Sequence, residues 1–525
     1  MSWIVIGESK NKVILVSKSH SETELPGILP KGSFLTVLGR DDTPRFVLRV
    51  DESSQHEVFK PNPLIVDMDL EGLYGEDRCQ NLIEAYRIKN LIKRNDGKID
   101  FIEPRLIARR SNQREVAIAL SGDTTETKNG PKVFLATLQG GENQHITDES
   151  GRYLTSILPS DMFFHQIQIS GKTGSGKTVA MKYFAQYFVE ELDGAVLAIN
   201  VKDIDLLTMD KSSNSLNVAE IEKEWNELSQ GPHGVGSSVI YYPANTSIES
   251  VQGITRSITE KITLDVKKID AESLTGLLQN ISDIGVQSLP DIFRYWQCNH
   301  RAARFLDFVT YFNQAQENSY EFDTRNIRGD ESRIRLHSGT YGNIQRSLNS
   351  ATEFFDNSDA KVLNEMDILA HGKLSIINVT GAKGVQFGSI LLRDLLHKIV
   401  EAKSIGESKV PILVIIDEVH QFYNTENSRD ALADLDTICR TGRSQEIGVI
   451  FASQNENDIP KGLSSVINTK ILFRSDISSS RYLGVEAEEI QSLSPGYAIV
   501  SVHGTPQLRI VKFPISYAGV NSGKG

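Results

Sequence analysis

Short apolar runs with alternating hydrophobic and polar positions fill the first 70 residues. Turn-forming Gly, Pro and Asp separate five of them: WIVIG, NKVILVS, GSFLTVLG, RFVLRV and NPLIVDM. Successive side chains of a β-strand point to opposite faces, so a period of two predicts strands. Several short strands divided by turns are typical of a small barrel. Two further runs, FIEPRLIARR and EVAIALSG, are expected to complete the barrel or to cap the next domain.

Residues 76–94 carry a different pattern, with a period close to that of a helix. One apolar stripe recurs at helical spacing, through Leu82, Ala85, Ile88 and Leu91. The stripe predicts a linker helix. We therefore expect residues 1–150 to form an N-terminal β-barrel followed by this helix.

Beyond residue 155 the apolar positions become continuous runs separated by amphipathic stretches. The runs are FFHQIQIS, GAVLAINVK, KLSIINV, PILVIID, IGVIFASQ and NTKILFR. Continuous apolar runs predict strands buried on both faces, and their alternation with helices predicts an α/β fold with a parallel sheet. A final β pair, GYAIVSV and QLRIVKF, precedes a tail, SYAGVNSGKG, that is expected to be flexible.

Between residues 246 and 365 the apolar positions follow a helical period instead. The stripes are Leu274, Leu277, Leu278 and Ile281, then Phe305, Leu306 and Val309, then Ile344, Leu348, Ala351 and Phe355. This block predicts an all-helical insertion. The α/β core is then expected in two parts, 151–245 and 366–525, the second including the C-terminal tail.

The most specific motif lies between the first α/β strand and the helix after it. It fits the phosphate-binding pattern GxxxxGK[ST] and consists of Gly171, Lys172, Thr173, Gly174, Ser175, Gly176, Lys177 and Thr178. The backbone N–H groups of such a loop, and the dipole of the next helix, favour a phosphate anion. Lys177 is expected to reach the β- and γ-phosphates of ATP, and Thr178 to hold Mg²⁺.

A second acidic motif ends the run PILVIIDEVH. Five apolar residues predict a buried central strand, and Asp417 and Glu418 follow at its exposed tip. Alone, such a pair could be a solvated strand end. Together with the phosphate loop it predicts that Asp417 contacts the Mg²⁺ and that Glu418 polarises the attacking water.

Polar residues around the next strand complete the candidate site. Gln454 is the first polar side chain after IGVIFAS, and is expected to sense the γ-phosphate or the water; a simple strand cap is the alternative. In the segment ICRTGRSQEIG, Arg443 and then Arg440 are candidates for a cation supplied to a neighbouring subunit's γ-phosphate. Stabilisation of a helix end is the alternative for either arginine.

The charge balance limits how DNA could be bound. The chain has 56 Lys and Arg against 68 Asp and Glu, a net charge of −12, so any DNA contact must be local, such as a pore lined by a few cations. Lys202 and Lys383 are candidates for phosphate contacts. No stretch approaches 18 uninterrupted apolar residues and no signal peptide begins the chain, so a soluble cytoplasmic protein without a membrane partner is expected.

Taken together, these motifs resemble the HerA branch of the HerA and FtsK superfamily of hexameric P-loop ATPases. The resemblance lies in HQIQISGKTGSGKT, IIDEVH, GRSQEIG and IFASQ before NTKILFR. It implies a RecA-like core, an N-terminal barrel, and a homohexamer that hydrolyses ATP between subunits and translocates double-stranded DNA. It also implies a separate nuclease or other effector docked on the barrel, in DNA processing or antiphage defence. Asp417 departs from a frequent Glu, and Ser453 from a frequent Thr; both changes are chemically mild.

Two other functions share the same motifs. One is an ATP-binding ring that scaffolds and activates a defence effector with little translocation. The other is a pump of the conjugation ATPase type, which usually needs a membrane anchor.

Overall fold

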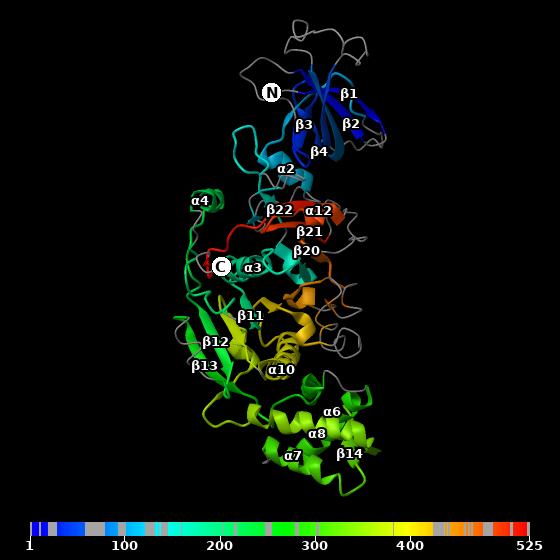
Figure 1. Cartoon of the computed structure of the whole chain (residues 1–525), viewed down its shortest axis with the longest axis vertical. Helices are drawn as coiled ribbons and strands as arrows, with labels where there is room; N and C mark the ends of the chain where they lie inside the picture. The colour runs from blue at the N-terminus through cyan, green and yellow to red at the C-terminus, as the bar shows by residue number, and fades with distance from the viewer. Residues whose placement is uncertain are drawn as a thin grey trace, which may run out of the picture. The chain divides into compact units, whose positions relative to one another are not determined.

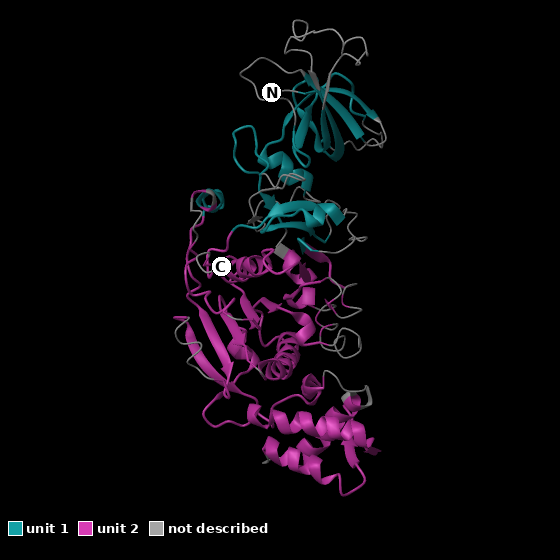
Figure 2. Cartoon of the chain, viewed as in Figure 1, with its two compact units in different colours: residues 1–160, 222–229, 472–514 teal, residues 161–221, 230–471, 515–525 magenta. Residues whose placement is uncertain are grey.

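The computed structural model of the 525-residue chain contains two compact units, coloured separately in Figure 2. Unit 1 comprises residues 1–160, 222–229 and 472–514, and unit 2 comprises residues 161–221, 230–471 and 515–525. The residues that the structure describes are 3–9, 12–18, 29–57, 79–92, 101–120, 132–134, 136–137, 145–158, 160–202, 204–214, 218–246, 255–278, 283–300, 304–381, 383–423, 435, 438, 442–455, 458–459, 463, 466–475, 487–503 and 508–521.

Unit 1 begins with a closed antiparallel barrel whose strands follow the order β1-β2-β5-β4-β3-β6 (Figure 1). The alternating positions fill its interior, where Trp3, Leu15 and Leu48 are fully buried. The predicted barrel is therefore confirmed, while the run NPLIVDM lies outside the described residues. The strands are β1 (Trp3–Ser9), β2 (Lys12–Lys18), β3 (Phe34–Leu38), β4 (Pro44–Glu57), β5 (Cys79–Asn90) and β6 (Ile107–Arg110).

The predicted linker helix is wrong, because residues 79–90 form the barrel strand β5. The segment carries two apolar patterns at once. Asn81, Ile83 and Ala85 alternate as buried positions, and this period of two was masked by the helical stripe. Pairing with β2 on one side and β4 on the other gives the strand hydrogen bonds along its whole length, and this tertiary context outweighs helix propensity.

The rest of unit 1 joins sequence-distant segments. The antiparallel strands β21 (Tyr497–Ser501), β22 (Arg509–Lys512) and β8 (Ala136–Thr137) lie side by side. The side chain of Arg509, only 2% exposed, donates to the carbonyl oxygens of Leu120 at 2.6 Å and Ile157 at 2.9 Å. The final β pair is thus grouped with N-terminal segments in unit 1. The other elements are α2 (Gln113–Leu120), β7 (Lys132–Phe134), β9 (Ser156–Ile157), α4 (Val218–Glu227) and α12 (Ala487–Gln491).

Unit 2 is built on a sheet with the order β16-β13-β12-β17-β11-β18-β19-β10-β20. Neighbours from β16 to β10 are parallel, as the continuous apolar runs predicted. The strands are β10 (Ile167–Ser170), β11 (Ala195–Asn200), β12 (Ser238–Pro243), β13 (Ile258–Thr263), β16 (Lys361–Val362), β17 (Leu374–Asn378), β18 (Ile412–Ile416), β19 (Ile447–Ser453) and β20 (Thr469–Phe473). A 3₁₀ helix, η1 (Ser160–His165), precedes β10, and η4 (Val419–Gln421) follows β18.

The segment 246–365 is only partly helical. Its helices bury most positions of the predicted stripes, although Leu306 is 63% exposed and Ile281 lies outside the described residues. However, β13 and β16 extend the main sheet, and β14 and β15 form a separate hairpin. The prediction of an all-helical insertion is therefore wrong in this respect. Its other elements are η2 (Ala271–Leu277), α6 (Asp283–Asn299), α7 (Phe305–Gln314), β14 (Glu321–Arg325), β15 (Glu331–Arg335), α8 (Ser338–Ala351) and η3 (Thr352–Phe354); α9 (Glu365–Ile368) follows it.

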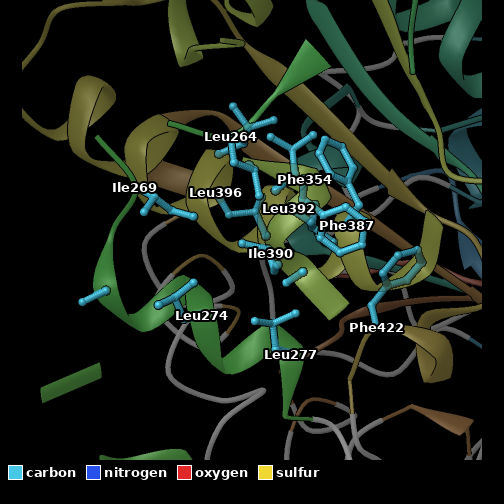
Figure 3. Close-up of a cluster of buried hydrophobic side chains, with 14 of the residues drawn as sticks. Leu264, Ile269, Leu274, Leu277, Phe354, Phe387, Ile390, Leu392, Leu396 and Phe422 are labelled. Carbon is cyan, nitrogen blue, oxygen red and sulfur yellow. The ribbon is translucent and has the colours of Figure 1, made fainter. Parts of the chain in front are cut away.

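Hydrophobic packing fixes this segment to the α/β core. Leu274 and Leu277 of η2 pack near Phe387 and Ile390 of α10 (Gly384–Ser404), as Figure 3 shows. A Cβ atom on Gly276 would lie 2.9 Å from the backbone nitrogen of Ile390, so only glycine permits this approach of η2 to α10. None of the helices in the described ranges is long and apolar enough to cross a membrane.

Residues 516–521 of the tail that was expected to be flexible pack within unit 2, and residues 522–525 lie outside the described residues. Ala518 forms a β-bridge with Ser212, and Tyr517 and Ala518 are buried. The ammonium of Lys182, on the helix α3 (Lys177–Glu190), donates to the carbonyl oxygen of Gly519 at 2.6 Å. The small residues of this tail follow no periodic pattern, so the sequence did not predict that they pack. The packing depends on hydrogen bonds to the backbone and on one aromatic side chain.

Candidate active site

The predicted phosphate loop lies between β10, which ends at Ser170, and α3, which begins at Lys177. Gly174 and Gly176 have φ angles of 76° and 113°, in a region that favours glycine. The hydroxyl of Ser175 is buried and accepts or donates no hydrogen bond within the described residues. A buried hydroxyl without a partner is costly, so its position on this loop indicates a polar ligand such as a phosphate.

Lys177 is folded over the loop that precedes it. Its ammonium donates to the carbonyl oxygens of Gly171 at 2.5 Å and Lys172 at 3.1 Å, and the residue is 8% exposed. Burial lowers its pKa, and the charges of Asp417 and Glu418 oppose that shift. The ammonium therefore lies in the field of both carboxylates, as expected for a group that meets a metal-bound phosphate.

Sheet order brings the other predicted residues together. Since β19 lies between β10 and β18, the carboxyl ends of all three strands share one edge of the sheet. Gln454 follows β19, and its amide donates to Oε1 of Glu418 at 3.2 Å. The backbone N–H of Glu418 donates to Oδ1 of Asp417 at 2.9 Å. The carboxylate pair and the amide thus form one cluster, although the roles assigned to them stay predictions.

The pKa values of the two carboxylates are shifted in opposite directions. Burial raises the pKa of Asp417 to about 6, and the neighbouring charge of Glu418 acts in the same direction. Burial also acts to raise the pKa of Glu418, but hydrogen bonds from Lys202 and Gln454 outweigh it and lower the value. Glu418 is accordingly the stronger acid of the two, because its two donors stabilise its charged form.

The backbone of Glu418 is itself unusual. Its φ of 49° and ψ of 53° are left-handed, which costs a residue with a side chain about 1 kcal/mol or more. Such strain persists when the surroundings fix the residue. Here Asp417, Lys202 and Gln454 all hold Glu418, so its placement is determined by contacts as well as by chain direction.

Lys202 was predicted to contact DNA, but in the structure it forms an ion pair with Glu418. The sequence places Lys202 directly after the apolar run of β11, but it does not show that β11 lies beside β18. Lys383, the other candidate, is 48% exposed and forms an ion pair with Glu353. Neither lysine is a free cation.

The donor set fits a hard divalent cation. Thr178 stands in the first turn of α3 and Asp417 at the tip of β18, and hydroxyl and carboxylate oxygens are ligands that Mg²⁺ accepts beside phosphate oxygens. These two residues would hold the ion, which would neutralise charge on the phosphates.

Arg443 lies away from this cluster. It precedes β19, whereas Gln454 follows it, and a seven-residue strand spans about 20 Å. Arg443 is 65% exposed and pairs with Asp161 at 3.7 Å. Gly442 beside it is required by packing, since a Cβ atom would meet the carbonyl oxygen of Ile447 at 2.5 Å. Arg440 lies outside the described residues.

No protein-family model matches the sequence, and no curated protein does. Several solved structures are similar. VirB4 of Thermoanaerobacter pseudethanolicus is 12% identical, with 74% of this chain and 97% of that chain covered and a TM-score of 0.43. The plasmid coupling protein TrwB in complex with ADP and Mg²⁺ is 13% identical, with 78% of this chain and 93% of that chain covered and a TM-score of 0.46. At these identities and TM-scores, the likeness carries no argument about activity.

Proposed function

We propose that the chain is a HerA-type ATPase that assembles as a homohexamer and uses ATP and Mg²⁺ to move double-stranded DNA. The observation that carries the proposal is the cluster of Lys177, Asp417, Glu418 and Gln454 at one edge of the parallel sheet, on the strands beside the phosphate loop. This set contains a phosphate-binding cation, a metal ligand, a base and a polar amide, which are the groups that ATP hydrolysis requires.

Each side chain has a distinct task in this proposal. Lys177 and the backbone N–H groups of residues 171–178 bind the phosphates, and Thr178 and Asp417 hold the metal. Glu418 orients the water and accepts its proton as the water attacks the γ-phosphorus. Gln454 holds Glu418 and can reach the water or the γ-phosphate.

The ring is proposed because Arg443, the arginine candidate that the described residues include, lies away from the phosphate loop of its own chain. Arg443 lies at the amino edge of the sheet, about 20 Å from the carboxyl edge, and is exposed. An arginine so placed can act only on the site of another subunit. A closed ring of head-to-tail subunits puts such a face against every phosphate loop.

Partner docking on the N-terminal barrel is supported by an apolar patch there. Ile4, Ile6 and Ile107 are 48%, 51% and 47% exposed, and Ile4 lies directly opposite Ile107 in the pairing of β1 with β6. Several exposed β-branched residues on adjacent strands are typical of a protein contact. We propose that a nuclease or other effector subunit binds there, in DNA processing or antiphage defence.

The test measures ATP hydrolysis with and without duplex DNA, and the mass of the assembly in solution. We expect a hexamer that hydrolyses ATP in the presence of Mg²⁺. Duplex DNA of any sequence should stimulate this hydrolysis, and the stimulation should weaken as the salt concentration rises. Hydrolysis indifferent to DNA would favour the scaffolding ring. A monomer that hydrolyses ATP at the full rate would contradict the shared site.

A further inference from the structure

The carboxylate of Glu418 is held from both neighbouring strands. Lys202, which follows β11, and Gln454, which follows β19, both donate to Oε1 of Glu418. Because β18 lies between β11 and β19, the two donors approach from opposite sides of the strand that carries Glu418. One oxygen of the carboxylate thus carries an ion pair and a hydrogen bond.

The other oxygen, Oε2, has a different environment. It is buried and accepts no hydrogen bond within the described residues; Nδ1 of His420 lies 3.5 Å away. A carboxylate oxygen has two lone pairs, and a buried one without a donor is costly. No hydrogen bond within the described residues thus occupies the lone pairs of Oε2, whereas Oε1 carries both donors.

The backbone at Lys202 is fixed by amide contacts at the strand tips. Asn200 donates to Oδ1 of Asn378 at 3.1 Å and accepts from the backbone N–H of Leu206 at 3.0 Å. The ends of β11 and β17 and the chain beyond Lys202 are thereby joined. The lysine stem thus leaves the chain between two tethered residues, Asn200 and Leu206, so its ammonium is directed by the fold and not only by attraction to Glu418.

We propose that Lys202 is a positioning residue for ATP hydrolysis, which holds Oε1 of Glu418 so that Oε2 receives the proton of the attacking water. The inference rests on the proposed ATPase activity. In the step, the water oxygen bonds to the γ-phosphorus and one water proton passes to Oε2. The bond from the γ-phosphorus to the bridging oxygen breaks, and its electron pair leaves with ADP.

Pairing with an ammonium makes a carboxylate a weaker base, which by itself would slow the step. Phosphoryl transfer, however, depends mainly on the placement of the water and on charge stabilisation. A glutamate that rotates freely loses that placement. Loss of the lysine is therefore expected to lower the rate and not to raise it.

The test compares Lys202→Met with Lys202→Arg and with a matched control, Lys361→Met. Lys361 is 44% exposed, close to the 41% of Lys202, and pairs with Asp367 at 2.7 Å on the edge strand β16 of the same sheet. We expect Lys202→Met to lower kcat by about 30-fold, part of what a general base contributes, with KM within about twofold of wild type. Arginine at 202 should restore kcat to within about threefold, and Lys361→Met should match wild type.

A second measurement tests whether Lys202 acts through Glu418. In single-turnover assays, adding Lys202→Met to Glu418→Gln should change the rate by less than about twofold, because both changes remove one function. Multiplied effects would overturn the proposal. So would a normal kcat in Lys202→Met, or a raised KM with unchanged kcat, which would make Lys202 a phosphate-binding group. A lowered melting temperature with no rescue by arginine would indicate a structural lysine and equally overturn it.

The two proposals fail differently. If wild type and Lys361→Met hydrolyse no ATP, the proposed function is wrong and this inference goes with it. If both hydrolyse ATP and Lys202→Met has the same kcat as wild type, the proposed role of Lys202 is wrong while the proposed function stands. If Lys202→Met binds duplex DNA more weakly while kcat is unchanged, Lys202 is a DNA contact, as its sequence position first indicated. That result would also overturn the inference.

Discussion

The two edges of the parallel sheet in unit 2 hold their charged side chains in opposite ways. At the carboxyl edge, the side chain of Glu418 is 3% exposed and is bound by Lys202 and Gln454. At the amino edge, the side chain of Arg443 is 65% exposed and pairs with Asp161 at 3.7 Å. One edge holds a buried carboxylate within a network of donors, and the other presents a cation to solvent.

This difference shows where each group has its effect. A buried carboxylate that loses its donors is costly, so Glu418 ties the carboxyl edge to its own fold. An exposed pair contributes about 1 kcal/mol or less, so Arg443 does little for its own chain. The proposed effect of Arg443 is on ATP hydrolysis in a neighbouring subunit. The predictions below test whether the two edges are halves of one site.

The largest effect is expected at the carboxyl edge from Lys177→Ala. The ammonium should make at least two charge-assisted hydrogen bonds to phosphate, each worth about 1.5 kcal/mol, so ATP affinity should fall by about 100-fold or more. Titration with a fluorescent ATP analogue measures this, and the elution volume of the assembly provides the control for folding. A variant that hydrolyses ATP normally would overturn the site assignment.

Glu418→Gln should retain ATP but stop turnover. The amide keeps the shape of the side chain and still accepts from Lys202, while it cannot take a proton, so kcat should fall by up to about 10⁴-fold. Steady-state kinetics and nucleotide binding, measured on the same preparation, separate the two effects. Near-normal turnover would assign the base to another residue.

The carboxyl edge was largely predictable because its motifs are local. The loop from Gly171 to Thr178 is continuous, and Asp417 and Glu418 directly follow an apolar run. What could not be predicted is the ion pair of Lys202 with Glu418, 216 residues apart. That contact requires β11 to lie beside β18, and a run of apolar residues does not specify its neighbour in a sheet.

Two errors in the fold have the same origin. The segment around Ile83 satisfies both a helical and a β period, and only pairing with β2 and β4 decides between them. The C-terminal residues around Tyr517 lack a periodic pattern, yet backbone bonds to Ser213 and His233 hold them in unit 2. In both places the deciding interactions join segments far apart in the chain.

At the amino edge, Arg443→Ala should lower kcat by about 10³-fold if the arginine completes a neighbouring site. The sharper measurement mixes it with Lys177→Ala, which has an intact Arg443 but cannot bind ATP. In a random ring about a quarter of the interfaces join an intact phosphate loop to an intact arginine, so activity should reappear. Wild-type folding of each variant alone is the control. If the mixture stays inactive while both variants form rings, Arg443 does not act between subunits.

The smallest effect is expected from Asp161→Asn, which removes the carboxylate partner of Arg443 without touching the arginine. The pair is exposed on both sides, at 49% and 65%, and its contact of 3.7 Å is long, so it should contribute about 0.2–1 kcal/mol to stability. The melting temperature should therefore change by only a few degrees, and kcat by less than about threefold. Asp161 also lies 3.5 Å from Nε2 of His165, so Asp161→Asn should be compared with Arg443→Lys to separate the two partners. A loss of kcat as large as that of Arg443→Ala would mean that Asp161 positions the arginine. The amino edge would then contribute two residues to the site of the neighbouring subunit, and not Arg443 alone.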